Sequence, residues 1–277
     1  MSGAPPVAFR AAAGHFWAVL LGTAIAYVKR SNAYLIDIVR WPLFPLMLYA
    51  TLQVAYAASG RAEVAGANVE GFLLVGIVGL LVWGATLWSG GYAIEWERST
   101  GTIAALLLSP ASRVAVVLGY GVGGLVWLLP GFAVVALLGL ATGARFDVSD
   151  PLAPLAATAA LAAGSLATGF ALAGLFILSR RANLLANFLQ TPIYLLAGFI
   201  VPREELPGWL RPVSDGVPVS HAVDALRASA LRGAGVGEIG GEIGLALLTA
   251  AGFALVGVVG LRRVERVAKR GDQLEFS

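Results

Sequence analysis

The chain has 277 residues, of which 58% are hydrophobic and only 13% are charged, and its formal net charge is +3. A soluble domain carries about 25% charged residues, so this composition excludes a soluble globular protein and predicts a membrane protein. The chain contains no cysteine, which excludes disulfides and thiolate chemistry. Its basic residues are spread along the chain, which favours a role in membrane orientation over nucleic-acid binding.

The first apolar stretch, residues 16–28, lies between Arg10 and the pair Lys29-Arg30. It is shorter than the roughly 20 apolar residues that a membrane-spanning helix requires. We therefore expect residues 7–30 to form a helix along the cytoplasmic membrane surface. A signal peptide or a seventh span are the alternatives. No cleavage site of small residues precedes Lys29, and a seventh span would reverse the orientation.

Six later stretches are long and apolar enough to span a membrane as helices. They are residues 34–57, 72–94, 114–141, 152–178, 184–201 and 243–261. Arginine and lysine are concentrated in the N-terminal segment, in the second and fourth loops and in the tail, residues 262–277. The positive-inside rule then places both ends in the cytoplasm. We expect one all-α transmembrane domain over residues 1–277, in a bacterial plasma membrane.

Two pairs of glycines at four-residue spacing are candidates for close helix packing. Gly119 and Gly123 lie in the third expected span, and Gly240 and Gly244 lie around the start of the last, with Gly240 just before it. Small residues let helix backbones approach one another in lipid. Because glycine is common in membrane helices, neither pair by itself predicts a contact.

A short polar segment, residues 95–113, separates the second and third spans and contains an apolar stub. Gly101 permits a turn before the stub, and Pro110 ends it. The apolar residues of the stub recur at helical spacing: Ile103, Leu106 and Leu107. A helix of two turns is not stable alone in water, so it requires a surface to lie on. The lipid headgroup layer and a groove on another protein are the two candidates.

The run from Glu97 to Pro110, ERSTGTIAALLLSP, resembles the E-R-x-x-G-T-x-x-x-L-L-x-(S/T)-P signature of type-2 ABC exporter permeases. In that family this segment forms a coupling helix that docks on a separate ATPase subunit. The resemblance implies two such ATPase subunits, which bind ATP and Mg²⁺, and a second permease copy or a homologue. The residues that it assigns to coupling are Glu97, Arg98, Gly101, Thr102, Ile103, Leu106, Leu107, Ser109 and Pro110.

A second motif lies in the loop before the last span, residues 202–238. Its parts PREELPGWL, from Pro202, and PVSHAVDALR, ending at Arg227, are similar to the family's P-x-x-x-L-P-x-W-L and P-x-x-x-x-V-D-A-L-R patterns. In the family this loop forms short helices that re-enter the outer leaflet. With both motifs, the resemblance extends over nearly the whole chain.

In the family, the first, second and fifth spans approach the axis between two permeases. Polar and aromatic residues there are candidates for the substrate path, although helix–helix hydrogen bonding or an interface belt also accounts for each. They are Gln53, Trp83, Thr86, Trp88, Asn187, Gln190 and Thr191. A largely apolar path suits export of a drug, secondary metabolite or lipid. Polysaccharide or lipid-linked glycan export is the main alternative, and sodium or peptide efflux ranks below it.

The sequence lacks the motifs of several other classes of protein. The chain has no P-loop, no H-E-x-x-H and no G-x-S-x-G, so we expect neither an enzyme nor a cofactor or metal bound to this chain. Ser220, His221 and Asp224 lie close together, but adjacent serine and histidine rarely align for catalysis. A channel or secondary transporter usually carries acids deep in its spans. Here only Asp37 and Arg40 intrude, near the cytoplasmic end of the first span.

Overall fold

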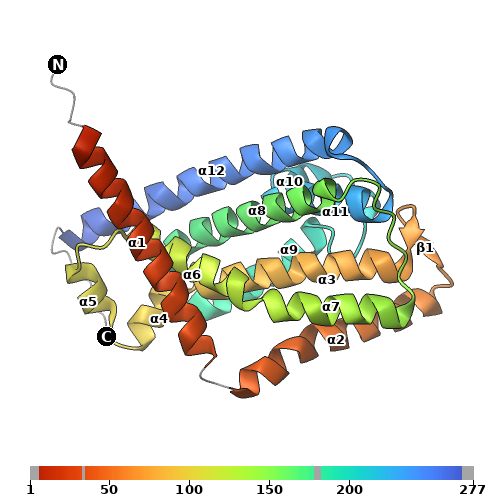
Figure 1. The fold of residues 1–277 in the computed structure, drawn as a ribbon, viewed down its shortest axis with the longest axis horizontal. Helices are drawn as coiled ribbons and strands as arrows, with labels where there is room; N and C mark the ends of the chain where they lie inside the picture. The colour runs from red at the N-terminus through yellow and green to blue at the C-terminus, as the bar shows by residue number, and fades with distance from the viewer. Residues whose placement is uncertain (1–5, 33–34, 178–181, 270–277) are drawn as a thin grey trace.

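The computed structural model describes residues 6–32, 35–177 and 182–269, and it describes the backbone alone for residues 6–12, 35–42, 104, 107, 177 and 264–269. Within these ranges the chain is almost entirely helical, and its long helices form an elongated bundle (Figure 1). Four of the described helical stretches are long and apolar enough to cross a membrane. The chain is therefore an all-α membrane protein, apart from one small β-hairpin.

The first half of the bundle contains α1 (Pro6–Ser31), α2 (Leu35–Ala58), α3 (Val69–Thr86), the π-helical turn η1 (Leu87–Gly91), α4 (Ala93–Ser99), α5 (Ile103–Leu108), α6 (Arg113–Trp127) and α7 (Leu129–Thr142). The second half contains α8 (Leu152–Ile177), α9 (Ala182–Leu196), the 3₁₀ turn η2 (Arg203–Glu205), α10 (Arg211–Asp215), α11 (Pro218–Leu231) and α12 (Val236–Lys269). The strands β1 (Glu63–Val64) and β2 (Ala67–Asn68) pair antiparallel, with Val64 opposite Ala67. The sequence patterns did not predict this hairpin.

Several connections between helices lie at one of the two ends of the bundle (Figure 1). One end holds α5, the C-terminal end of α12 and the N-terminal end of α1. The other end holds the β1–β2 hairpin and the loop between α7 and α8. The hairpin end also receives the loop that follows α11, since the backbone of Gly233 donates to the carbonyl of Asp147 over 2.9 Å.

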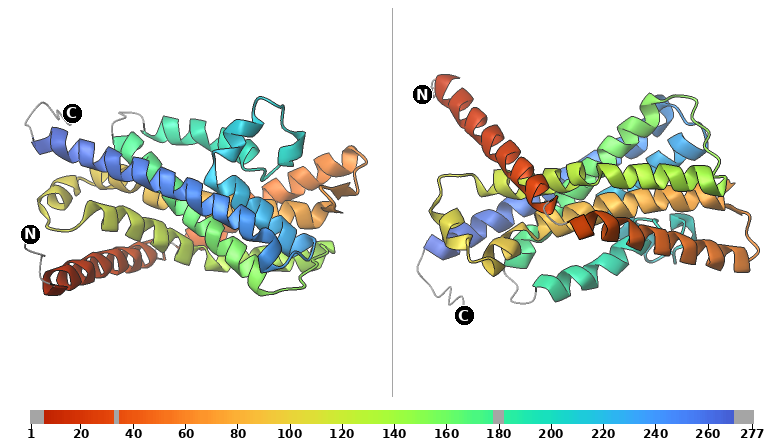
Figure 2. Two further views of the ribbon diagram at one scale, coloured as in Figure 1. Left: turned by 90° about the horizontal axis from the view of Figure 1, so that it is seen from above. Right: turned by 60° about the horizontal axis from the view of Figure 1, so that its bottom comes forward.

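Helix α3 lies at the centre of the bundle and contacts α2, α6, α7, α8 and α11. Beyond Glu70 in the first turn, its residues are apolar on every side, so no face of this part of α3 is suited to water. Phe72, Leu73, Leu74 and Trp83 are almost completely buried along it. Helix α12 packs along α8 on the outside of this core (Figure 2). The central position of α3 is important because α3 continues through η1 into α4, in which the expected coupling segment, residues 95–113, begins.

The helices differ from the expected spans in three places. The third expected span is two helices, α6 and α7, that meet at Leu128, because Pro130 in the first turn of α7 interrupts the ladder of backbone hydrogen bonds. Helix α9 ends at Leu196 because Gly198 turns the chain with a φ of +72°. Helix α12 extends beyond the last expected span at both ends.

The four long apolar stretches correspond to the second, third, fourth and sixth expected spans. In the first expected span, the described residues Leu43–Ala58 form a shorter apolar helix, and the side chains of Asp37 and Arg40 lie outside the described part. Helix α9 has 15 residues. Its length of about 22 Å is less than the roughly 30 Å of a bilayer core.

The glycine pair of α6 forms the contact surface for α1. A Cβ atom on Gly119 would lie 2.6 Å from the carbonyl oxygen of Leu20, and one on Gly123 would lie 2.9 Å from that of Ala24. Leu20 and Ala24 are buried in this contact. Gly240 and Gly244 have no neighbouring atoms within 4 Å of the corresponding positions. Of the two pairs, only that of α6 makes a close helix contact within the described chain.

Candidate functional site

The turn between α4 and α5 explains the spacing of the first motif. Gly101 follows the last turn of α4 with a φ of +74°, a left-handed conformation that glycine adopts without steric cost. The amide of Thr102 donates to the carbonyl of Glu97 over 2.9 Å, and that of Gly101 donates to the carbonyl of Arg98 over 3.1 Å. These two bonds form a Schellman motif, which ends a helix and reverses the chain. The Gly-Thr pair of the motif is therefore a helix stop.

The carboxylate of Glu97 joins α4 to α6 and to the start of α5. Its Oε1 accepts a hydrogen bond of 2.5 Å from the phenol of Tyr120, and its Oε2 accepts one from the hydroxyl of Thr102. Arg98 forms an ion pair of 2.8 Å with Glu95. The two charged residues of the motif therefore have different partners: Glu97 binds neutral donors, and Arg98 binds a carboxylate one turn earlier in the same helix.

Helix α5 lies on the protein's own surface. Ile103 and Leu106 pack against a buried cluster of residues from α4, α6, α8 and α12. The opposite face is exposed: Thr102, Ala105 and Leu108 point outward, and the side chain of Leu108 is 88% exposed. The side chain of Leu107 lies outside the described residues. The surface that this short helix requires is thus supplied by its own chain.

The last two residues of the first motif lie in the bend after α5. The hydroxyl of Ser109 accepts a hydrogen bond of 3.0 Å from the amide of Ala111. Pro110 is exposed beside it. Ser112 then caps α6, because its hydroxyl accepts from the amide of Ala115 over 3.4 Å. The bend therefore leads directly from α5 into α6.

Three of the expected substrate-path residues line one open groove of about 250 Å³ between α2, α3 and α9. They are Trp88, Asn187 and Gln190, and Phe44 and Tyr194 complete the aromatic part of the wall. Figure 2 shows α2 and α9 on the same side of the bundle. Gln190 donates to the hydroxyl of Tyr194, and Asn187 donates to the carbonyl of Asn183 over 2.9 Å. The groove combines aromatic rings with amide groups.

The other expected path residues lie elsewhere. Trp83 is fully buried in the core, and Thr86 is buried with its hydroxyl bonded to the carbonyl of Trp83 over 2.9 Å. Gln53 lines a separate cavity of about 430 Å³ beside the β-hairpin. Thr191 is exposed on α9. Sequence position on an expected span therefore does not distinguish residues that face the groove from residues that support the fold.

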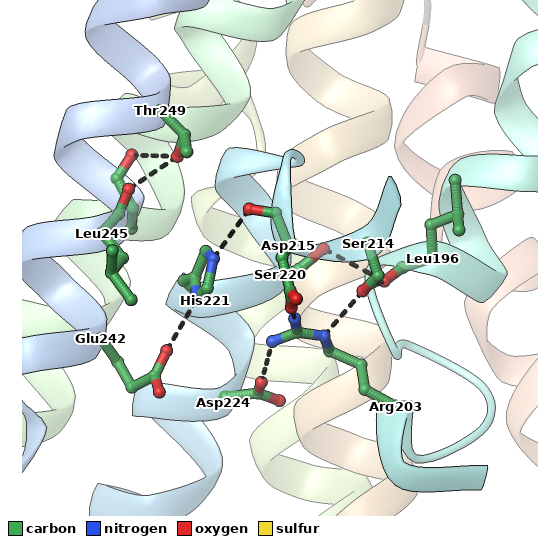
Figure 3. Close-up of polar contacts among 11 residues, drawn as sticks. Leu196, Arg203, Ser214, Asp215, Ser220, His221, Asp224, Glu242, Leu245 and Thr249 are labelled. Carbon is green, nitrogen blue, oxygen red and sulfur yellow. Dashed lines mark hydrogen bonds and ion pairs between the residues drawn. The ribbon is translucent and has the colours of Figure 1, made fainter. Parts of the chain in front are cut away.

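The second motif folds into a polar cluster around Arg203 (Figure 3). The guanidinium of Arg203 donates to the hydroxyl of Ser214 over 2.7 Å and forms ion pairs with Asp215 and Asp224. Burial raises the pKa of Asp224, and the neighbouring Arg203 opposes this shift. Ser214 in turn donates to the carbonyl of Leu196 over 2.6 Å. The cluster therefore ties η2, α10 and α11 to the end of α9.

Ser220, His221 and Asp224 do not form a triad. The hydroxyl of Ser220 donates to the carbonyl of Leu196 over 3.1 Å. The ring of His221 binds Glu242 of α12 at 2.8 Å and the carbonyl of Asp215 at 2.9 Å (Figure 3). Each side chain has a different partner, so the arrangement connects helices and has no nucleophile aligned with a base.

The final arginine of the second motif is buried against the central helix. Arg227 is only 5% exposed, and its guanidinium carbon lies 3.9 Å from the centre of the Phe72 ring. Burial lowers the pKa of Arg227 to about 10, so it remains charged at neutral pH. The ring face supplies the negative charge density that a desolvated cation needs. The motif thus fastens α11 to α3.

Comparisons with known proteins agree with both motifs. A family model described as ABC-2 type transporter matches residues 8–231. The chain is 23% identical over 245 residues to the daunorubicin resistance ABC transporter permease protein DrrB1 of Streptomyces coeruleorubidus, covering 87% of this chain and 81% of that protein. It is 26% identical over 147 residues to the inner membrane transport permease YhhJ of Escherichia coli (strain K12), covering 52% of this chain and 39% of that protein. The family match covers most of the chain, which therefore belongs to the ABC-2 type transporter family as a multi-pass membrane permease subunit.

Proposed function

We propose that this permease is the membrane subunit of an ATP-driven exporter, with six spans, α1 at the cytoplasmic membrane surface and both ends in the cytoplasm of a bacterium. The support is the location of α5 at the same end of the bundle as the C-terminal end of α12 (Figure 1). That part of α12 carries Arg262 and Arg263, which the positive-inside rule assigns to the cytoplasm. The helices of the second motif then face the outer leaflet.

The observation that carries the coupling role is the division of α5 into two faces. Ile103 and Leu106 hold the helix on the permease, and the opposite face, with Ala105 and Leu108, is free to contact a cytoplasmic ATPase subunit. Two such subunits bind ATP and Mg²⁺ in this proposal. When they close, they displace α5. The Schellman turn and the Glu97 bonds pass the displacement to α4, which continues through η1 into the central helix α3.

The groove between α2, α3 and α9 is the proposed cargo surface. Trp88 and Phe44 offer ring faces, while Asn187 and Gln190 offer amides, a combination that fits an amphipathic molecule such as a drug, secondary metabolite or lipid. A second permease copy, or a homologue, closes the open side. The name of DrrB1 refers to daunorubicin resistance, and at 23% identity this relative supports the drug class without identifying the cargo.

Co-purification tests the coupling role. The full chain is expressed with the candidate ATPase subunits of its genome, and complex formation and ATPase activity are measured in nanodiscs. Leu108→Asp is expected to abolish complex formation while the melting temperature of the permease stays unchanged. Val148→Asp, an equally polar change near the hairpin end, is the control and leaves the complex intact. Binding of no ATPase subunit, or retention of binding by Leu108→Asp, contradicts the proposal.

Stimulation of ATPase activity tests the cargo class. Daunorubicin and a lipid-linked glycan are added separately to the reconstituted complex. We expect stimulation by the drug, and its loss in Gln190→Ala, while Gln53→Ala, which lies in a different cavity, keeps it. Stimulation by the glycan alone would assign the complex to glycan export instead. A response of Gln53→Ala equal to that of Gln190→Ala would exclude the groove as the cargo surface.

A further inference from the structure

A second link to the coupling segment starts from α1, through the side chain of Arg30. The guanidinium carbon of Arg30 lies 4.4 Å from the ring centre of Trp96, and 5.4 Å from the ring centres of Tyr27 and Tyr120. The rings of Tyr27 and Tyr120 also meet edge to face at 5.8 Å. We call these four residues the Arg30 box.

The Arg30 box joins three helices that are far apart in the sequence. Arg30 and Tyr27 belong to the last turns of α1, Trp96 to α4 and Tyr120 to α6. A guanidinium over several ring faces is held more firmly than one over a single ring, because each face contributes electrostatic attraction. The cation therefore lies where α1, α4 and α6 meet.

The Arg30 box continues directly into the bonds of the first motif. Tyr120 presents its ring to Arg30, and its hydroxyl donates to Glu97. Glu97 also accepts from the hydroxyl of Thr102, at the start of α5. A chain of contacts thus runs from α1 through Arg30, Tyr120 and Glu97 to α5. It reaches the coupling segment from α1 and α6, whereas the covalent route leaves the segment from α4 through η1 into α3.

Helix α1 contacts α6 with one side, and its opposite side is exposed. Leu20 and Ala24 are buried on the glycine pair of α6, whereas Trp17, Leu21 and Ile25 are more than half exposed at four-residue spacing. This outward stripe is apolar, so it suits lipid rather than water. When α1 moves, this stripe therefore moves relative to the surrounding lipid.

We propose that Arg30 is a positioning residue that makes α1 and the coupling segment move as one body. This inference rests on the proposed role of residues 95–113 in coupling. Without Arg30, α5 still pulls on α3 through α4, but α1 is linked to this movement only by its packing on α6. The energy of ATP then produces less movement at the membrane surface, and ATP hydrolysis becomes less well coupled to transport.

Because the natural chain has no cysteine, two spin labels can be attached at introduced cysteines. Leu21→Cys on α1 and Ser99→Cys on α4 are both at exposed positions. The distance between the labels is measured by pulsed electron resonance in nanodiscs, first on the permease alone and then on its complex with the ATPase trapped with ATP and vanadate. The two labels are introduced into four proteins: the otherwise wild-type chain and the variants Arg30→Met, Arg30→Lys and Lys29→Met. Lys29 is the matched control, since it is the adjacent exposed cation of α1.

In the permease alone, we expect one narrow distance distribution for wild type and Lys29→Met, a broad one for Arg30→Met, and a nearly narrow one for Arg30→Lys, which keeps the charge. On trapping, the distance stays constant in wild type and increases in Arg30→Met. ATP hydrolysed per daunorubicin transported rises at least threefold in Arg30→Met only. Identical distributions for Arg30→Met and Lys29→Met in the permease alone would overturn the inference. If no ATPase binds any variant, the proposed function fails, while the measurement on the permease alone still decides the role of Arg30.

Discussion

Tyr120 of α6 donates its phenolic hydroxyl to Glu97 of α4 over 2.5 Å, and in the sequence the two residues lie on opposite sides of α5. The bond closes the segment into a loop whose two ends are fixed to each other. Because α5 also packs on the cluster beneath it, the helix is held on its inner face and at its base, with its outer face exposed.

Removal of this hydroxyl is expected to destabilise the loop. Tyr120→Phe keeps the ring and removes a hydrogen bond to a carboxylate, which corresponds to about 2 kcal/mol in the free energy of unfolding. A double-mutant cycle with Glu97→Ala, measured by chemical denaturation in detergent, isolates the bond. The effects of the two single variants should not add. Strict additivity would show that the two side chains do not interact.

The Schellman turn predicts a ranking of substitutions at position 101. Gly101 has a φ of +74° and no atom within 4 Å of a Cβ, so a side chain there meets strain in the backbone but no clash. Gly101→Ala should cost about 1–2 kcal/mol, and Gly101→Asn less, because asparagine tolerates the left-handed region. Thermal unfolding of the three proteins gives the ranking. If the Gly101→Ala variant proves as stable as the wild-type protein, the turn has a different conformation.

The two glycine pairs should respond in opposite ways to one methyl group. Gly119→Ala places a Cβ 2.6 Å from the backbone of α1 and should destabilise the protein by about 1–3 kcal/mol. Gly240→Ala meets no atom and should be neutral or stabilise the protein by up to about 1 kcal/mol, because alanine favours a helix. Both are compared by melting temperature. Equal losses in the two variants would refute the assignment of the α6 pair as the α1 contact.

Two arginines near the hairpin end of the bundle should differ in their contribution to stability. Arg203 is largely buried and binds Ser214, Asp215 and Asp224 at once, so Arg203→Ala leaves the largely buried Asp224 without its ion-pair partner and should cost about 3 kcal/mol. Arg61 forms an exposed pair with Glu205 over 2.7 Å, so Arg61→Ala should cost less than about 1 kcal/mol. The denaturation midpoints of the two variants and of the wild-type protein measure these losses of stability. A small effect of Arg203→Ala would mean that the cluster around it is not structural.

Much of the organisation could be predicted from the sequence, because it depends on composition and on local pattern. Long apolar runs predict membrane helices, since a bilayer has no water to satisfy an exposed backbone. The Gly101-Thr102 pair predicts the turn, since only a few residue types stop a helix in this way. The two motifs indicated the family, and the family match over residues 8–231 confirmed it.

Contacts between distant segments could not be predicted, because they depend on how the helices pack. Arg30, Tyr120 and Arg203 gave no local signal: each is an ordinary residue until another helix lies beside it. The same limit applies to the expected path residues. Trp83 and Trp88 are close in sequence, but their positions on the turns of α3 and η1 direct one into the core and the other into the groove.

The sequence by itself determined that this protein lies in a membrane, which stretches are long and apolar enough for membrane helices, and which short polar segment separates two of them. Only the tertiary structure decided which face of α5 is exposed, which glycine pair holds α1 and which arginine joins α1 to the coupling segment. The physical reason is the separation in sequence over which each property is set. Hydropathy and turn geometry depend on neighbouring residues, whereas burial, hydrogen bonding and cation–π contacts depend on partners that the fold brings together from distant parts of the chain.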